Sequence, residues 1–238
     1  MFSLKRLQSP QASWCLLALI LVNGHAAAAG PCPLHTGRNG KPTEELAGPR
    51  ETLFGLRDRL QRIKQKLSAP DARKITTAAL ADVDFMIRGW TPGNKIPPEY
   101  SASLHLPLKL LDFAIESEQE GPAFSALQAA ADDLHIKAEH CRKSGVGLGE
   151  MVTVVIRTRS GEREQRNLQV LYMPKLMEVV KEGRPNQFPQ FSSPTRHILP
   201  PGRYLMWTRE PQSNMVGART MVRVGDGSKI AEWNLPAP

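Results

Sequence analysis

Aromatic residues are scarce in this chain, at 6% of 238 residues, and no apolar run approaches the ~20 residues that a membrane-spanning helix needs. Glycine does not recur at every third position, which excludes a collagen-like chain. Hydrophobic residues make up 41% of the sequence against a net charge of +8, a balance that excludes a disordered chain. The length therefore indicates a globular protein of one large or two small domains, and the patterns below favour two.

Motifs of several common enzyme classes are also missing. No glycine-rich phosphate loop follows a strand pattern, and no Gly-x-Ser-x-Gly or His-Glu-x-x-His segment is present. The glycines at 145, 147 and 149 come after a helical pattern and before a strand pattern, the wrong order for a nucleotide site. We therefore expect no cofactor, and an enzyme of an unfamiliar kind stays open as an alternative.

The first 29 residues have the pattern of a cleaved secretory signal peptide. Lys5 and Arg6 precede the apolar run 14–22, and small residues follow it. We expect cleavage after Ala27 or Ala29, which would leave no transmembrane anchor and place the protein in the periplasm or outside the cell. A retained anchor is the alternative, although a nine-residue run is short for one.

Cleavage would remove Cys15 and leave Cys32 and Cys141 in an oxidising compartment, where thiols tend to pair. One disulfide between them is the simplest interpretation, and it would tie a polar tail at 30–48 to the end of a helix. Its expected role is structural. A free reactive thiol is the alternative, but Cys141 lies on an apolar helical seam, where burial suppresses reactivity.

Residues 49–145 show helical periodicity. Apolar residues recur every three or four positions over 51–67, 75–90, 104–115 and 124–141. Ser68 and Asp71 have the spacing of a capping box at the start of the second helix, and Pro107 is tolerable only in the first turn of the third. Short links between these segments predict a four-helix up-and-down bundle.

Charge differs between the two helical hairpins. Residues 50–74 carry eight basic and three acidic residues, whereas residues 112–139 carry seven acids and one Lys. We expect these two charged edges to face one another across the bundle. A docking role for each edge is the alternative.

The hydrophobic period changes to two after residue 147, which predicts a second domain over 148–238. Strand patterns at 151–158 and 168–173 predict one hairpin, and those at 218–224 and 229–235 predict another around the turn 225–228. Further elements are expected at 174–181 (a short helix), 196–199 and 203–209 (strands). Short strands without crossover helices favour an antiparallel β-sandwich, so the predicted class is α+β.

The segment 199–207, Leu-Pro-Pro-Gly-Arg-Tyr-Leu-Met-Trp, leads into one of these strands through a proline turn. With the strands that follow, about 40 of the 238 residues, it resembles the closing half of the carboxypeptidase regulatory-like, transthyretin-related β-sandwich domains of secreted proteins. The resemblance implies an Ig-like or transthyretin-like sandwich that serves as an accessory or interaction module. It also implies a structural role for Tyr204 and carries over no catalytic residue.

On the fourth helix, Asp132, His135 and Glu139 are separated by three and four residues and so project from one face. These side chains are candidate metal ligands and would serve a metal-dependent extracytoplasmic enzyme. The alternative is a solvated helix face with an intramolecular pair of histidine and carboxylate.

Arginine dominates the charge of the strand region. Residues 147–238 carry ten Arg and three Lys against eight acids, a composition that suits contacts to carboxylate or phosphate groups. The candidate binding residues are Arg157, Arg159, Trp207, Arg209 and Trp233. Together with Tyr172 and Tyr204, the two tryptophans would form a carbohydrate platform if exposed, whereas such rings more often fill a core.

The leading hypothesis is a secreted or periplasmic, non-enzymatic protein that presents a basic β-sandwich to an anionic envelope polysaccharide or protein. Phospholipid head groups are a further anionic candidate. Nucleic acid is not expected, because the signal peptide would remove the protein from the cytoplasm. A carbohydrate-binding module, the metal-dependent enzyme and surface charge that serves solubility alone stay open as alternatives.

Overall fold

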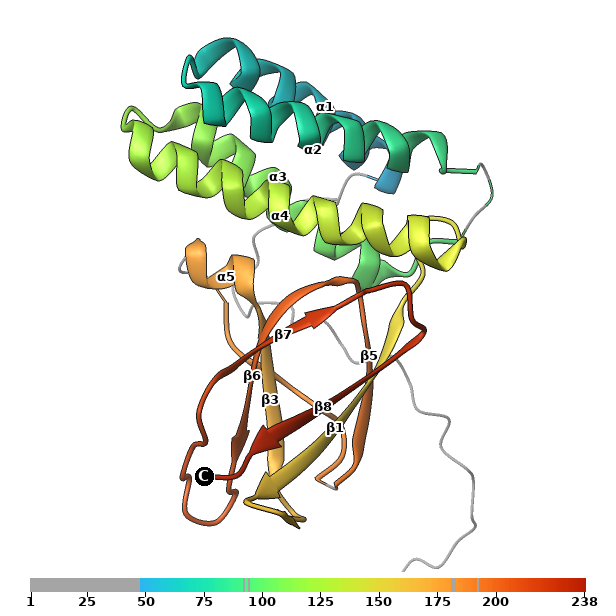
Figure 1. The fold of residues 1–238 in the computed structure, drawn as a ribbon, viewed down its shortest axis with the longest axis vertical. Coiled ribbons are helices and arrows are strands. Elements are labelled where there is room, and N and C mark those ends of the chain that lie inside the picture. Colours follow the sequence, from blue (N-terminus) through green and yellow to red (C-terminus); the bar gives the residue numbers. More distant parts are fainter. Residues whose placement is uncertain (1–47, 92, 94, 181–182, 192) are drawn as a thin grey trace, which may run out of the picture. The chain divides into compact units, whose positions relative to one another are not determined.

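The computed structural model describes residues 48–238 except 92, 94, 181, 182 and 192. The expected signal peptide at 1–29, most of the polar tail at 30–48 and Cys32 therefore lie outside the described residues. Helices come first and strands second, which confirms the α+β class. The helices are α1 (Pro49–Lys66), α2 (Pro70–Arg88), α3 (Pro98–Glu116), α4 (Glu120–Ser144) and, among the strands, the short α5 (Lys175–Val179) (Figure 1).

Proline and glycine set several helix ends. Prolines occupy the first turns of α1, α2 and α3. Backbone N–H groups in the first turn of a helix make no hydrogen bond within the helix, so proline, which has no N–H, costs nothing there. Gly145 follows α4 with a positive φ of 67°, a conformation that favours glycine. The capping box expected from Ser68 is wrong, because Ala69 precedes α2 and no side chain caps its N-terminus.

Helix α3 begins earlier than its apolar pattern predicts. It starts at Pro98, and Pro107 lies inside the helix rather than in its first turn. Pro107 lacks the N–H that would bond to the carbonyl four residues back, so the helix continues past one missing hydrogen bond. Burial of the flanking Leu104 and Leu111, both 0% exposed, favours the helix in spite of that loss.

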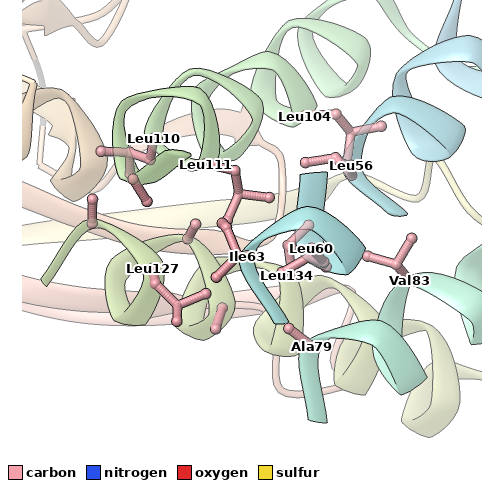
Figure 2. Close-up of a cluster of buried hydrophobic side chains, with 14 of the residues drawn as sticks. Leu56, Leu60, Ile63, Ala79, Val83, Leu104, Leu110, Leu111, Leu127 and Leu134 are labelled. Carbon is pink, nitrogen blue, oxygen red and sulfur yellow. The ribbon is translucent and has the colours of Figure 1, made fainter. Parts of the chain in front are cut away.

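The four long helices share one apolar core. Helix α1 packs on α2 and α3, and α4 packs on the same two helices. Figure 2 shows apolar side chains from all four meeting in this core, where full burial of a leucine contributes about 1.5–3 kcal/mol. At the surface, Arg59 of the basic segment donates to Asp112 of the acidic segment at 2.8 Å. Among the described residues, no helix combines the length and the apolar character needed to cross a bilayer.

The strands form two sheets. In the first sheet, β1 (Val152–Ser160) pairs with each of the other three strands. These are β2 (Arg163–Glu164), β5 (Thr195–Leu199) and β8 (Ile230–Pro236). The second sheet has the order β4 (Asn186–Gln187), β3 (Gln169–Pro174), β6 (Gly202–Arg209) and β7 (Thr220–Val224). The described pairs are antiparallel except β1 with β8, which run parallel.

Both hairpins expected from the sequence are wrong. Strand β1 turns back through Gly161 into the short β2, whereas β3 belongs to the second sheet and pairs with β6. The turn at 225–228 joins β7 of the second sheet to β8 of the first, so it crosses between sheets. The parallel ladder of seven residue pairs between β8 and β1 outweighs a local two-stranded pairing, which is only marginally stable alone.

Alternate strand residues point between the two sheets and form a shared core. Residues buried there include Val154, Ile156, Met206 and Val222. The Tyr204 hydroxyl donates to the carbonyl of Pro200 at 2.8 Å, a buried contact of the kind a structural role needs. Leu205 and Trp207 point to the opposite face of the second sheet, where they belong to a separate buried cluster.

One end of the sheets lies against α4. This helix-covered end consists of the β5–β6 turn at 200–201, the first residue of β6, Gly202, and the β7–β8 turn at 225–229. A Cβ on Gly225 would lie 2.6 Å from Pro201, and one on Gly227 would lie 2.5 Å from Lys143 of α4. Both glycines have positive φ values near 100°, so no other residue fits these turns without strain.

The other end of the sheets is formed by loops. This open end consists of residues 161–168, Phe191 of the β4–β5 loop and residues 210–212 of the β6–β7 loop. The C-terminal residues also reach this region, because the N–H of Ala237 donates to the carbonyl of Arg159 at 2.7 Å. Helices and strands belong to a single compact unit, so the two ends are parts of one body.

Candidate functional site

One face of α4 carries charged side chains into the contact with the strands. Asp133, Lys137 and His140 follow one another at spacings of four and three, and all three are buried. The Lys137 ammonium donates to the Asp133 carboxylate at 2.5 Å, with 2% and 10% of the two side chains exposed. A Cβ on Gly202 would lie 3.0 Å from the same carboxylate, so glycine allows the β5–β6 turn to approach closely.

Burial dominates the electrostatics of this face. It raises the pKa of the Asp133 carboxyl, although the charge of Lys137 opposes the shift. Burial also raises the pKa of the Tyr204 hydroxyl, and the neighbouring Asp133 charge adds to that shift. A buried ion pair adds little net stability relative to apolar residues, but removal of one partner leaves an uncompensated charge. Removal of Lys137 would therefore leave the Asp133 carboxylate buried without its cation.

His140 lies fully buried toward the C-terminal end of the same face. Its Nδ1 accepts a hydrogen bond from the backbone N–H of Gly227 at 3.2 Å, so a neutral ring carries its proton on Nε2. Nε2 lies 3.5 Å from Oε2 of Glu150, and both atoms lack a hydrogen-bond partner among the described residues. Burial lowers the pKa of His140, with the carboxylates of Glu150 and Asp226 opposing the shift.

The candidate metal ligands on α4 do not converge on one point. Asp132 binds Arg203 of β6 at 3.0 Å, whereas Glu139 contacts Arg223 of β7. His135 lies 3.8 Å from Glu139 but is not joined to Asp132. Across the part of the chain that the structure describes, no group of three His, Cys, Asp or Glu side chains is placed to hold a metal ion. Asp132 and Glu139 instead link α4 to the strands.

Cys141 is buried near the end of α4, with 8% of its surface exposed, and is a free thiol in this structure. Burial raises the pKa of the thiol, which disfavours the reactive thiolate. Its expected partner Cys32 lies outside the described residues, so the disulfide stays a prediction.

The five candidate binding residues do not form one site. Trp207 is 5% exposed on the outer face of the second sheet, where the Arg219 guanidinium lies 4.9 Å from its ring centroid. Arg209 donates to Gln169 at 2.9 Å, and Trp233 packs against the core between the sheets. Neither tryptophan is freely exposed, so the condition for a carbohydrate platform on these rings is not met.

Arg157 and Arg159 lie together on the outer face of the first sheet. The residues that alternate with them along β1 are buried, so both arginines point away from the second sheet. The register places Arg196 of β5 opposite Val155, on the same face and two residues from Arg157. Arg157 lies 3.7 Å from Glu164, whereas Arg159 and Arg196 are exposed and form no ion pair with another described residue. We call Arg157, Arg159 and Arg196 the arginine ladder.

The same outer face becomes apolar toward the helix-covered end. Thr153 pairs with Ile198 of β5 on one side and with Ile230 of β8 on the other. The two isoleucines are 56% and 59% exposed. The face therefore offers an exposed apolar row beside the arginine ladder.

Two cavities carry polar groups. A cavity of about 820 Å³ at the open end is lined by residues 164–168, Phe191 and residues 210–212. A smaller one of about 220 Å³ lies between α4, α5 and β6. Its charged groups already have partners, because Arg203 binds Asp132 and Lys175 contacts Glu178. The cavity at the open end is the better candidate for a ligand.

Comparisons with protein-family models, curated proteins and solved structures found no match to the chain.

Several residues of these sites escaped the sequence analysis. Asp133, Lys137 and His140 recur at helical spacing beside the apolar residues of α4. This spacing is the sequence signal that would have indicated a row of buried polar side chains. Arg196 alternates with buried residues of β5, but its place beside Arg157 follows only from the register between distant segments.

Proposed function

We propose that the chain is a secreted or periplasmic, non-enzymatic binding protein that presents the arginine ladder to an anionic partner of the cell envelope. The observation that carries the proposal is the different pairing of arginines across the strand region. Arg203 and Arg223 bind acids of α4, whereas Arg159 and Arg196 have no acidic partner among the described residues. Unpaired guanidinium groups suit bidentate contacts to carboxylate or phosphate.

The finer architecture belongs to the same proposal. The pairwise packing and short links of α1 to α4 favour an up-and-down four-helix bundle. Two sheets with a shared core, and a tyrosine that bonds back to a carbonyl four residues upstream, favour an Ig-like or transthyretin-like β-sandwich. The resemblance of the segment 199–207 to carboxypeptidase regulatory-like domains agrees with a sandwich used as an interaction module.

Two features support an envelope partner. The signal-peptide pattern at 1–29 directs the chain out of the cytoplasm, where acidic polysaccharides and acidic protein surfaces are available. The exposed Ile198 and Ile230 add an apolar row to the same face, so the partner is expected to combine acidic and apolar groups.

Affinity capture from native envelope extract tests this proposal. The baits are the mature protein (30–238) and two variants that each lose two positive charges, R157Q/R196Q and R203Q/R223Q, at low and high salt. We expect a salt-sensitive partner on the mature protein and on R203Q/R223Q, but not on R157Q/R196Q. Equal capture by both variants would contradict a role for the arginine ladder.

A further inference from the structure

A ligand can approach the sheets at the open end, where loops connect the strands. Helix α4 closes the opposite end, whereas the β1 arrowhead and the C-terminus lie away from the long helices in Figure 1. Segments from both sheets surround its cavity of about 820 Å³. Sites for small ligands typically occupy about 300–1,000 Å³, and loops at one end of a strand scaffold commonly carry binding residues.

Side-chain amides are prominent in this cavity. Gln165, Asn167 and Gln212 line it, and their amides form no hydrogen bond with another described residue. Each amide offers two N–H donors and one carbonyl acceptor. A ligand with adjacent hydroxyl groups, each both donor and acceptor, satisfies such amides better than an apolar ligand does.

An exposed aromatic ring stands beside these amides. Phe191 is 47% exposed and shares the cavity with Pro211, while Leu168, 5% exposed, forms an apolar floor. A flat ring in a polar cavity can stack against the C–H face of a sugar ring, while the hydroxyls at the sugar edge reach the amides.

The charged groups of the cavity are balanced by their neighbours. Glu164 accepts a hydrogen bond from the Ser193 hydroxyl at 2.6 Å and lies 3.7 Å from Arg157 of the ladder. Glu210 contacts the Ser213 hydroxyl, and Arg166 adds a positive charge to the lining. This balance favours a neutral ligand inside the cavity.

We infer that the cavity at the open end binds a neutral saccharide unit, a hexose or an N-acetylated amino sugar within a polysaccharide. The inference rests on the proposed function and deepens it, because it names a polysaccharide rather than a protein as the envelope partner. Glu164 joins the two regions, since it lines the cavity and contacts Arg157. Acidic groups farther along the same polysaccharide would bind the arginine ladder.

An NMR titration of the mature protein with cellotetraose, maltotetraose and chitotetraose tests the inference. We expect at least one probe, at millimolar concentration, to shift the side-chain amide signals of Gln165, Asn167 and Gln212, equally at low and high salt. F191A is expected to weaken this binding about tenfold. F113A, which removes a phenylalanine of similar exposure (49%) from α3, is the matched control and should bind as the wild type does.

Two outcomes overturn the inference: no shift with any of the three probes, or equal binding by F191A and F113A. The variant R159Q/R196Q, which changes the two ladder arginines that have no acidic partner among the described residues and leaves Arg157 beside Glu164, separates this result from the proposed function. It should lose the anionic partner while it retains the neutral probe. Salt-sensitive capture without sugar binding would overturn the saccharide inference alone. Sugar binding without salt-sensitive capture would overturn the role of the arginine ladder alone.

Discussion

Arginines in two regions of the strands have similar exposure but different neighbours. The side chains of Arg203 and Arg223 are 45% and 44% exposed and bind acids of α4, whereas Arg157 is 39% exposed and lies 3.7 Å from Glu164. Glu232 of β8 lies on the same face as Arg157, opposite Val155. Arg159 and Arg196 have no acidic partner among the described residues. Near α4, the arginines are paired with acids of that helix. On the outer face of the first sheet, Arg159 and Arg196 lack such partners in the part of the chain that the structure describes, which is why we propose this face, rather than the whole basic region, as the binding surface.

The largest expected effect breaks the buried pair at the helix-covered end. Lys137→Met leaves the Asp133 carboxylate buried without its cation, which should destabilise the protein by about 3–5 kcal/mol in chemical denaturation. The double variant D133L/K137M removes both charges and should recover most of that loss. A loss below about 1 kcal/mol for the single variant would contradict the account of this contact.

A pair of glycine substitutions compares the two ends directly. Gly225→Ala places a methyl group 2.6 Å from Pro201 at a φ of 100°, and we expect a loss of about 2–4 kcal/mol. Gly161→Ala at the open end also has a positive φ, of 60°, but meets nothing within 4 Å, so about 1 kcal/mol is expected. Equal melting temperatures for the two variants would contradict a close contact between the Gly225 and Pro201 turns.

Acid should weaken the helix-covered end through His140. Because burial lowers the pKa of His140 below its ordinary value of 6.5, the unfolded chain binds more protons, and stability falls as pH falls below 6.5. The raised pKa of Asp133 acts in the opposite direction, since stability then falls as pH rises above 3.8. His140→Asn keeps an acceptor for the Gly227 N–H and removes the titration, so its stability should depend less on pH between 6.5 and 5.

His197 shares the direction of that shift, because burial lowers its pKa as well. His197→Gln, which keeps an acceptor near the Tyr172 hydroxyl that lies 3.0 Å from the ring, is therefore the companion variant. Denaturation curves at several pH values measure both effects. An unchanged acid-dependent loss in the H140N/H197Q double variant would contradict this assignment.

The smallest expected effect concerns the exposed links between α4 and the strands. Arg223→Ala removes the contact with Glu139, but such surface pairs contribute only about 0–1 kcal/mol. The effect should shrink further at high salt. A loss as large as that expected for Lys137→Met would contradict the small contribution assigned to this exposed link.

Local patterns predicted the helices better than the sheet topology. The periodicity of α1 and α4 places them within a few residues of their observed bounds, because burial of one stripe depends only on nearby residues. The start of α3 was predicted too late, because either Pro98 or Pro107 could occupy the first turn of a helix and the sequence does not distinguish them. The 225–228 turn predicted a hairpin, but a long-range parallel pairing of β8 with β1 decided the topology.

The candidate sites also divide into parts that local sequence patterns predict and parts that depend on long-range contacts. Arg157 and Arg159 are visible in the sequence as arginines on one strand, whereas Arg196 joins them only through the register of β5 on β1. The cavity at the open end gathers Phe191 and Gln212 from loops that are far apart in the sequence, so no local pattern predicts it. Trp207 is unsuited as a ligand platform because packing with Leu171 and Leu205 on the outer face of the second sheet buries it.

The most direct test of the central claim is the affinity of the mature protein for polygalacturonate, an acidic polysaccharide, measured over a range of salt concentrations. We expect the affinity to fall with salt, and R157Q/R196Q to lower both the affinity and the slope of that dependence. R203Q/R223Q should keep the wild-type slope, because those arginines already bind α4. The same affinity and slope for both double variants would contradict the claim that the arginine ladder is the binding surface.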